Sequence, residues 1–406
     1  MLRKRSRKIF CAALAALLLA GGGYAFCRFQ VPDTIYVQPG ETPSLADLPW
    51  VGIQSAAPSD NVNASMRDSS RNASARLFGT LSLKSIRVVE RTHQSVEVCG
   101  DLFGIKMFAD GALVVGFTEL YTAFGPQNPA KDAGLKLGDW VVSIDGHKIL
   151  CNEDIAQALQ QGSEQAKELV YKRDGQLFNT TILPVQDQNG DYKAGIWVRD
   201  SSAGIGTMTF FLGDTFAGLG HAISDSDTGQ SIELRSGEIV PVALNGVEKG
   251  CAGAPGELKG SFVSTQALGE IRDNYQAGVY GALLSHTLKT QPAEVAWMQE
   301  VKTGPAQLIC NVDGNGPKAY SIEIEKISYT SQNINKNMMI RVTDEALLAI
   351  TGGIVQGMSG SPILQDGKLV GAVTHVLVKD PTRGYAVLAQ TMLEKAENIP
   401  NTSDSP

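Results

Sequence analysis

Residues Gly357-Met358-Ser359-Gly360-Ser361-Pro362 are the stretch of this sequence that decides its fold and its chemistry. Apolar runs lie on both sides, so the pattern predicts a strand, a tight glycine turn and a second strand, with the Ser359 hydroxyl held at the turn. Glycine permits the sharp bend and the close approach of a substrate carbonyl. The backbone N–H groups of Gly357 and Ser359 would then point the same way, as oxyanion donors do in acyl-transfer enzymes. The same pattern also fits an ordinary Gly/Ser turn between two strands.

The composition favours a β-rich protein that does not bind nucleic acid. A chain of 406 residues is long enough for two globular domains and a leader. Its 43 glycines separate short runs rich in Val, Ile and Thr, which is typical of β structure. The formal net charge of −7 argues against a nucleic-acid partner, because phosphate binding needs a basic face.

The first 27 residues form a predicted targeting segment. Lys and Arg are concentrated within residues 1–8, and an unbroken apolar or small-residue run follows over 9–20. Because the positive flank stays inside, everything downstream is expected to be exported across a membrane. Both a cleaved signal peptide and an uncleaved membrane anchor fit residues 1–27.

The polar composition of residues 28–75 predicts a flexible tether, since it offers too few apolar residues for a core. Beyond it we expect one domain over 76–190, a second over 191–400 and a polar tail over 401–406. The four cysteines after the leader form no CxxC pair, so neither a metal nor a cofactor is expected. We expect buried free thiols at these four positions: Cys99, Cys151, Cys251 and Cys310.

Residues 90–185 resemble a PDZ domain. The most specific match is the stretch 129–139 with the following strand 141–146. The resemblance implies that N–H groups in the apolar-Gly-apolar stretch Phe103-Gly104-Ile105 hold a peptide carboxylate, and that the next strand adds the peptide as a further strand. Ile155 and Leu159, on a predicted helix, would line the other wall. The alternative is a domain that binds no peptide and only packs against its neighbour.

A serine nucleophile needs a base, and the chain has five histidines. His221 follows a glycine-framed turn at 218–220, which suits an imidazole presented at a strand end. His375, on the hairpin after Ser359, is the rival base. A structural, hydrogen-bonded role is the alternative for His221, and a place in a pocket wall or in the core is the alternative for His375. The other histidines lie in expected edges, turns or polar strands and are poorer candidates: His93, His147 and His286.

Four aspartates are candidates for the acid that orients the imidazole. Asp344 ends a predicted strand over 339–342, fifteen residues before Ser359. Asp225 and Asp227 resemble solvated turn residues, and Asp313 lies in an Asp-Gly-Asn-Gly turn.

Four long stretches resemble the peptidase domain of the stage IV sporulation protein B family: 195–209, 218–225, 249–257 and 352–362. The resemblance implies a mainly β chain in which a PDZ domain precedes a chymotrypsin-like serine peptidase domain with two β-barrels. It implies His221 as base, Asp344 as acid and Ser359 as nucleophile, with an oxyanion hole at Gly357 and Ser359. Asp344 departs from the general two-barrel pattern, because it stands close before the serine.

The resemblance also implies a function in sporulation signalling. An exported serine endopeptidase, located between the two membranes of the developing spore, would cleave its own N-terminal region. It would also cleave a membrane-bound regulator of an intramembrane protease complex, and a late sigma factor precursor would then be activated.

Three other functions are weaker alternatives. A catalytically silent PDZ scaffold that binds exported or membrane protein tails would not need His221 and Ser359. An HtrA-type quality-control protease has its peptidase domain before the PDZ domain. A zinc intramembrane protease needs an HExxH motif, which the sequence lacks.

Overall fold

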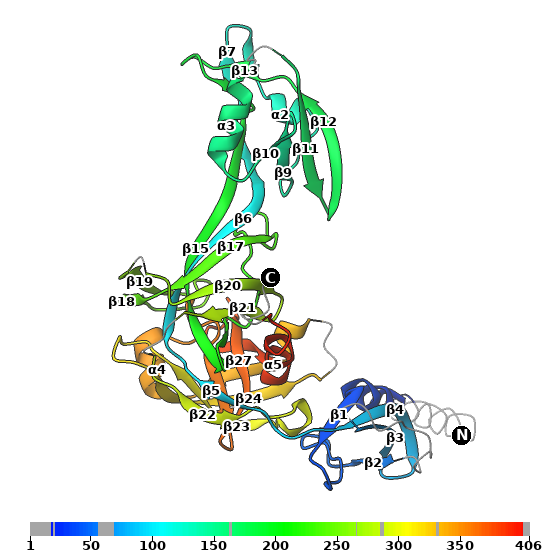
Figure 1. The fold of residues 1–406 in the computed structure, drawn as a ribbon. Coiled ribbons are helices and arrows are strands. Elements are labelled where there is room, and N and C mark those ends of the chain that lie inside the picture. The colour runs from blue at the N-terminus through cyan, green and yellow to red at the C-terminus, as the bar shows by residue number, and fades with distance from the viewer. Residues whose placement is uncertain are drawn as a thin grey trace, which may run out of the picture.

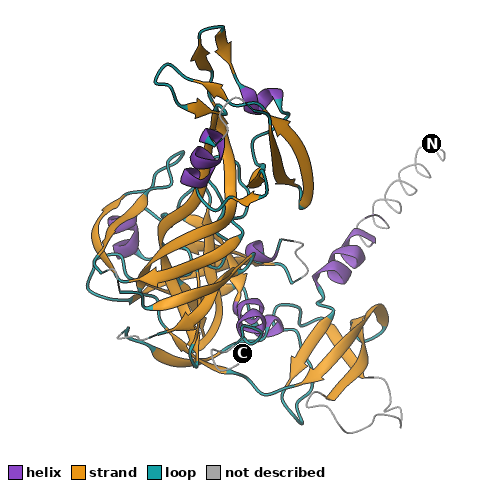
Figure 2. Ribbon diagram, turned by 45° about the horizontal axis from the view of Figure 1, so that its top comes forward, coloured by secondary structure: helices purple, strands orange, loops and turns teal. Residues whose placement is uncertain are grey.

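The computed structural model describes residues 18, 21–55, 69–161, 165–264, 266–284, 288–329 and 333–400. Within these ranges the chain forms a two-barrel body, a PDZ domain that projects from it and a small N-terminal sheet at its other side (Figure 1). Strands dominate all three parts, and the helices are short (Figure 2). The mainly β architecture expected from the sequence is confirmed.

The first barrel has six strands and closes because β6 and β15 also pair with each other. Its interior is filled by large apolar side chains such as Phe103, Met107 and Phe216, all of them fully buried. In sheet order the strands are β6 (Leu102–Phe117), β17 (Leu234–Val240), β20 (Gly269–Tyr275), β21 (Gly278–Leu283), β16 (Thr215–Gly218) and β15 (Ile196–Leu212).

The second barrel is also closed by six strands, and together the two barrels confirm the predicted chymotrypsin-like double barrel. Helix α4 (Glu345–Thr351) follows β25, and helix α5 (Ala389–Ala396) follows β28. The strands are β23 (Gly304–Cys310), β24 (Lys318–Ile327), β25 (Met338–Val342), β28 (Arg383–Leu388), β27 (Lys368–Val376) and β26 (Pro362–Gln365).

Shorter elements complete the body. Strand β5 (Ser95–Val98) pairs with β15 and with β22 (Gln291–Glu294). Strands β18 (Val242–Glu248) and β19 (Glu257–Phe262) form a separate hairpin. Two single-turn 3₁₀ helices, η1 (Met298–Glu300) and η2 (Ile334–Lys336), lie in connections.

The PDZ domain surrounds its own apolar core, to which Ile155 and Leu159 of helix α3 (Asn152–Gln160) contribute. Both side chains are buried among Val141, Ile144 and other core residues. They therefore do not line an open groove, contrary to the expectation from the sequence. The other elements are α2 (Pro129–Asp132), β9 (Trp140–Ile144), β10 (His147–Lys148), β11 (Lys167–Arg173), β12 (Gln176–Ile182) and the short pairs β7 (Leu120–Thr122) with β8 (Gly125–Gln127) and β13 (Val185–Gln186) with β14 (Tyr192–Lys193).

A long two-stranded ribbon makes the PDZ domain an insertion into the first barrel. β6 and β15 pair from Leu102–Thr207 at the barrel end to Phe117–Ile196 at the PDZ end. One half of each strand therefore belongs to each domain (Figure 1). A boundary at residue 190 separates the PDZ domain from the later strands, but the barrel also takes β6 from the segment before the PDZ domain.

The assignment of Phe103, Gly104 and Ile105 to a PDZ carboxylate-binding loop is wrong. These residues lie in the barrel half of β6, where Phe103 and Ile105 are buried in the barrel core. A Cβ at position 104 would lie 2.5 Å from the Phe262 ring, so packing explains this glycine. The apolar-Gly-apolar pattern fits such a strand as well as it fits a loop.

The expected tether over 28–75 is also wrong in its described part, because that region helps to build a four-stranded sheet. In sheet order the strands are β1 (Thr34–Val37), β4 (Leu81–Glu90), β3 (Ser69–Leu77) and β2 (Val51–Ser55). Strand β4, which lies beyond the predicted tether, supplies Leu83, Ile86 and Val88 to the core of this sheet. A polar segment with a few well-placed apolar residues can therefore form a packed sheet once β4 supplies further apolar side chains.

Residues 21–30 are helical, whereas most of the expected leader and the tail at 401–406 lie outside the described residues. Among the described residues, no helix reaches the length and apolar character needed to cross a membrane.

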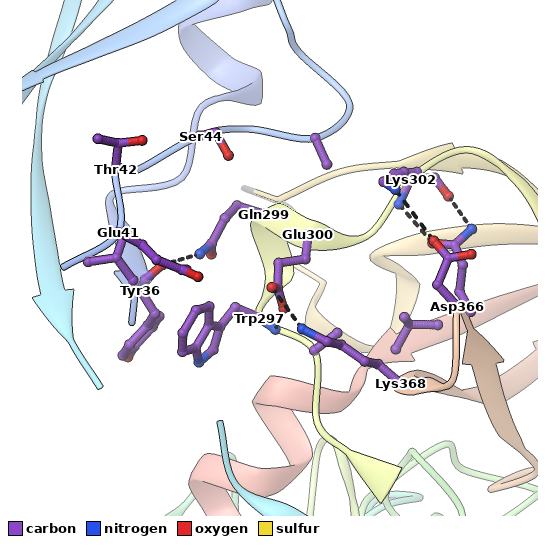
Figure 3. A pocket seen from close by; sticks show the side chains of 15 residues that line it. Tyr36, Glu41, Thr42, Ser44, Trp297, Gln299, Glu300, Lys302, Asp366 and Lys368 are labelled. Atoms are coloured by element: carbon purple, nitrogen blue, oxygen red, sulfur yellow. Dashed lines mark hydrogen bonds and ion pairs between the residues drawn. The ribbon is translucent and has the colours of Figure 1, made fainter. Parts of the chain in front are cut away.

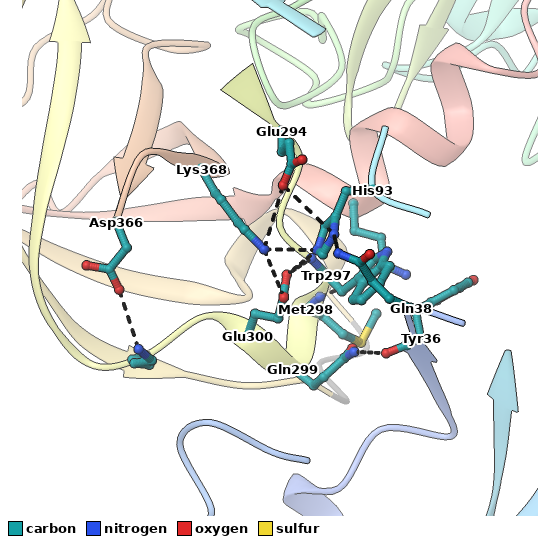
Figure 4. Close-up of polar contacts among 12 residues, drawn as sticks. Tyr36, Gln38, His93, Glu294, Trp297, Met298, Gln299, Glu300, Asp366 and Lys368 are labelled. Carbon is teal, nitrogen blue, oxygen red and sulfur yellow. Dashed lines mark hydrogen bonds and ion pairs between the residues drawn. The ribbon is translucent and has the colours of Figure 1, made fainter. Parts of the chain in front are cut away.

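A polar cluster joins the N-terminal sheet to the body, beside a cavity of about 270 Å³ (Figure 3). His93 stacks on Trp297 with 3.7 Å between ring centroids. Its Nε2 lies 2.8 Å from a Glu300 carboxylate oxygen and 3.0 Å from Nζ of Lys368 (Figure 4). Lys368 also donates to Glu300 at 3.0 Å. Because these groups pair with one another, we interpret the cluster as a structural contact.

Candidate active site

The Ser359 turn connects the end of α4 to β26 and depends on two glycines with positive φ. Gly357 has φ +93° and Gly360 has φ +94°, a region that L side chains rarely adopt. A Cβ at Gly360 would also lie 2.0 Å from the Thr207 carbonyl oxygen. The glycines around the serine are therefore required by backbone conformation and by close packing.

Strand β15 of the first barrel fixes the turn in place. The Thr207 N–H donates to the Ser359 carbonyl at 2.9 Å, and Thr207 Oγ1 donates to the Gly357 carbonyl at 2.8 Å. Thr209 Oγ1 donates to the Gly360 carbonyl at 2.7 Å. The nucleophile turn of the second barrel is thus held at the junction of the two barrels.

The oxyanion donors expected from the sequence are available. Within the described chain, the Gly360 N–H bonds to the Val373 carbonyl of β27, and the N–H groups of Met358 and Ser361 bond to carbonyls of their own loop, whereas those of Gly357 and Ser359 have no backbone acceptor. Two unpaired amides beside a hydroxyl are what stabilisation of a tetrahedral oxyanion needs. The second hydroxyl of the turn, on Ser361, is fully buried and lies 3.4 Å from Thr207 Oγ1.

His221 is presented where β16 leaves the first barrel. Leu219 and Gly220 have φ +65° and +68°, so the chain turns sharply just before the imidazole. Asn274 of β20 then clamps the loop: its Oδ1 accepts from the Ile223 N–H at 2.7 Å and its Nδ2 donates to the Ile223 carbonyl at 2.9 Å.

Ser359 and His221 line the same cavity, which has a volume of about 430 Å³. Apolar side chains make up much of the remaining wall, including Ile105, Ile205 and Leu219. The Ser359 hydroxyl donates to the Thr374 carbonyl at 2.8 Å. The structure therefore brings the predicted nucleophile and base to one site, with the hydroxyl in a resting orientation.

The state of His221 suits a general base. Its Nδ1 lies 2.8 Å from the Ala222 carbonyl oxygen, so a proton on Nδ1 leaves Nε2 as an acceptor. Burial lowers the pKa of His221, although the hydrogen bond to Ala222 opposes the shift.

The rival base, His375, has its ring centroid 4.9 Å from that of His221. Burial, and then the neighbouring His221 and Lys336, lower the pKa of His375 to about 4. Both imidazoles are therefore neutral near neutral pH.

The family profile named SpoIVB peptidase S55 matches residues 190–393, which is half of the chain. The chain belongs to this family. A PDZ profile matches residues 121–173. This S55 member is a serine peptidase with an inserted PDZ domain.

Curated relatives match the S55 chain only over short stretches. A Clostridium perfringens protein named as a zinc metalloprotease is 32% identical over 96 residues, 23% of this chain and 29% of the relative. The regulator of sigma-W protease RasP of Bacillus subtilis is 36% identical over 62 residues, 15% of each chain. The matches thus span less than a third of these relatives.

The solved structures that match this chain are distant in sequence. The Rv3671c protease from M. tuberculosis in its active form is 16% identical, covering 50% of this chain and 78% of that chain with a TM-score of 0.31. The HtrA-type protease AlgW with a decapeptide is 14% identical, covering 50% and 54% with a TM-score of 0.30. The fold of the S55 peptidase is therefore assigned from its own strand pairings and does not depend on these solved structures.

The structure does not place Asp344 with the other two expected triad residues. Asp344 is the N-cap of α4: its Oδ1 accepts from the N–H groups of Ala346 and Leu347 at 3.0 and 3.1 Å. Its Oδ2 accepts from the Ser321 N–H at 3.1 Å. It does not line the cavity, and the Ala222 carbonyl takes the position at Nδ1 of His221. The predicted acid is therefore corrected to a helix cap.

Asp225 differs from the solvated turn residue that the sequence predicts. It is buried, forms an ion pair with Arg199 of β15 and accepts from the Thr228 N–H at 2.8 Å. Asp227, which is exposed, lies 2.8 Å from the same guanidinium. This pair ties the loop after His221 to the ribbon, a role that no local motif announces.

The remaining candidates have ordinary surroundings. Asp313 forms an ion pair with Lys318 in its turn, and His147 is exposed in β10. His286 lies outside the described residues. The cysteines are free, as expected, but Cys251 is exposed and Cys151 is partly exposed, so the expectation of burial fails for these two.

One group of described residues has the spacing of metal ligands: Cys151, Glu153 and Asp200, whose ligand atoms lie within 4.8 Å of one another. Asp200 Oδ2 accepts from the Asn152 N–H at 2.9 Å, which makes it a cap for the start of α3. Capping explains this cluster without an ion, and among the described residues around Ser359 there is no group with such spacing.

Proposed function

We propose that this S55 peptidase is an exported serine endopeptidase of sporulation signalling whose active site is the cavity shared by Ser359 and His221. The observation that carries the proposal is the convergence of a serine from the second barrel and a histidine from the first on one cavity, next to two unpaired amides. This arrangement supports acyl transfer at a peptide carbonyl.

The mechanism follows from the positions of these groups. The Ser359 hydroxyl leaves the Thr374 carbonyl and turns toward His221, whose Nε2 takes its proton as the oxygen attacks the substrate carbonyl. The N–H groups of Gly357 and Ser359 hold the oxyanion, and one such donor contributes about 3 kcal/mol to transition-state stabilisation. His221 then returns the proton to the leaving amine. The Ala222 carbonyl, in the place of a carboxylate, maintains the tautomer.

The biological substrates that we propose follow the family resemblance. The enzyme would cleave its own N-terminal region and a membrane-bound regulator of an intramembrane protease complex, in the space between the two spore membranes. Residues 1–27 would export the chain or hold it at the membrane. Exposed Phe26 and Phe29, on the helix that follows the apolar run, support a location next to lipid, because aromatic side chains favour the membrane interface.

The test uses the full-length chain and a fluorophosphonate probe that reacts with activated serines. We expect rapid labelling of the wild-type protein and none of Ser359→Ala. Co-expression with the membrane regulator should show cleavage of the regulator and of the N-terminal region only when Ser359 is present.

Ser361→Ala is the matched control, since it removes the neighbouring buried hydroxyl from the same turn. It should keep its labelling. A wild-type chain that is folded by circular dichroism yet resists the probe would favour the catalytically silent scaffold. Labelling without cleavage of the regulator would retain the peptidase and reject the proposed substrate.

A further inference from the structure

One edge of β15 is open over a long stretch between the PDZ domain and Ser359. Near its end, residues 208–212 pair with β16 on this edge. β16 stops at Gly218, where the chain turns away toward His221. From residue 196 to residue 206, β15 pairs with β6 on its opposite edge and with no other described strand.

The pairing pattern shows which backbone groups point to the open edge. The N–H and C=O of Met208 bond to Asp101 and Gly100, so they face the β6 side. Because strand groups alternate, those of Thr207, Ile205 and Ala203 face away from β6. The Thr207 N–H confirms this direction, since it donates to the Ser359 carbonyl.

Beyond a bulge near residue 200, backbone N–H and C=O groups of β15 again point to the open edge, as far as the PDZ domain. Val114, the β6 partner of Val198, uses its own N–H and C=O to bond Asp139 and Gly138 on the far side. The backbone groups of Val198 therefore also point to the open edge. At this end the strand meets α3, whose Asn152 N–H bonds to Asp200.

The open edge leads into the catalytic cavity. Ser202, Gly204 and Ile205 line that cavity together with Ser359, and Ala203 is exposed. No atom lies within 4 Å of a Cβ built at Gly204, so the sheet face at this residue is uncovered. An extended chain laid on this edge would take up the position that β16 vacates and would pass the nucleophile.

We propose that the outer edge of β15, from Val198 to Ile205, binds an extended segment of the substrate as an added strand and guides it from the PDZ domain to Ser359. The inference rests on the proposed peptidase function. Ligand and site share backbone hydrogen bonds, so the ligand class is an unfolded polypeptide with free N–H groups at alternate positions. Proline at those positions prevents binding.

The strand also sets a spacing. Ile205 lies seven positions after Val198, and at roughly 3.3 Å per position this part of the strand spans about 23 Å. A substrate held beside α3 is therefore cut about seven or eight residues away from the held segment.

The test compares Ala203→Pro with Ala203→Val in the full-length chain. Proline removes an N–H that points to the open edge and takes no part in pairing with β6, whereas valine keeps it. Two probes are used: fluorescently labelled unfolded casein, and the small fluorophosphonate, which needs no added strand. We expect Ala203→Pro to lower kcat/KM for casein at least tenfold and to weaken casein binding in a Ser359→Ala background. Ala203→Val should stay within threefold of wild type.

Equal losses in the proline and valine variants would overturn the added strand, because crowding by the side chain would then explain them. So would wild-type protein that reacts with the fluorophosphonate but neither binds nor cleaves casein. In both cases the peptidase function would stand. Failure of the wild-type protein to react with the fluorophosphonate would instead reject the proposed function itself. Thermal unfolding of each variant confirms that it is folded.

Discussion

Ser359 holds its hydroxyl on the Thr374 carbonyl, so the hydroxyl has to leave this acceptor before it can act as a nucleophile. The imidazole it must reach is neutral and oriented by Ala222. At the scale of single residues, catalysis therefore depends on the protonation of His221 and on whether a carboxylate takes part at all.

The acid limb of the activity profile should lie below pH 6.5, the ordinary pKa of histidine. Burial lowers the pKa of His221, so its neutral form persists to lower pH than that of a solvated imidazole. The rate of fluorophosphonate labelling against pH measures this limb. His375→Gln should leave it in place, since His375, with a pKa of about 4, is already neutral there.

The same shift has a consequence for stability. Below pH 6.5 the unfolded chain protonates this histidine while the folded chain resists, so the free energy of unfolding should fall as the pH drops toward the folded pKa. An acid limb of the labelling rate that lies above pH 6.5 would contradict the assignment of His221 as a buried, neutral base.

Asp344→Asn should leave kcat/KM within about threefold of wild type. Asn caps a helix about as well as Asp, so α4 also keeps its start. A triad acid would behave differently, because such a substitution costs about 10⁴-fold where the carboxylate orients the base. Asp344→Ala is the companion variant, and it should lose about 1 kcal/mol of stability through the cap. Peptide cleavage kinetics and chemical denaturation separate the two effects.

At the scale of elements, the sequence predicted those features that depend on residues close together in the chain. The Gly357–Gly360 turn could be predicted because glycines with positive φ and an isolated serine lie within a few residues. The cap at Asp344 had a signal too, since an Asp before an apolar helical run is typical of a helix start. No local sequence signal placed Phe103 in the barrel, because the strand that pairs with it, β15, comes about a hundred residues later.

Gly104→Ala should destabilise the first barrel by about 1–3 kcal/mol, because the new Cβ would meet the Phe262 ring at 2.5 Å and Val240 at 2.8 Å. Gly204→Ala on β15 is the matched control, since nothing lies within 4 Å of its Cβ. Thermal unfolding measures the difference. If Gly104 instead belonged to a peptide-binding loop, its substitution would leave stability unchanged and impair peptide binding by the PDZ domain.

At the scale of the whole molecule, the N-terminal sheet is attached to the body through polar groups. The His93 side chain is 3% exposed in the contact with Trp297, Glu300 and Lys368. Composition alone could not reveal this contact, because Trp297, Glu300 and Lys368 lie some two hundred residues or more after His93 in the sequence.

His93→Ala should lower the free energy of unfolding by about 2 kcal/mol, since it removes a buried ring that stacks on Trp297 and hydrogen-bonds to Glu300. It should also speed trypsin cleavage at Arg91, which connects the sheet to β5. The control is His147→Ala, in an exposed hairpin of the PDZ domain, with an expected change within 0.5 kcal/mol. Equal effects of the two substitutions would mean that the cluster contributes no stability.

The insertion of the PDZ domain between β6 and β15 has a consequence for the order of folding. The barrel half of β6 emerges first during synthesis, yet its neighbour β15 follows only after some eighty residues of PDZ sequence. Closing so long a loop is entropically slow unless its contents fold first and bring the two ends together. A nascent chain would therefore mature from the inserted PDZ domain outward, and the enzyme would gain activity only after that domain is complete.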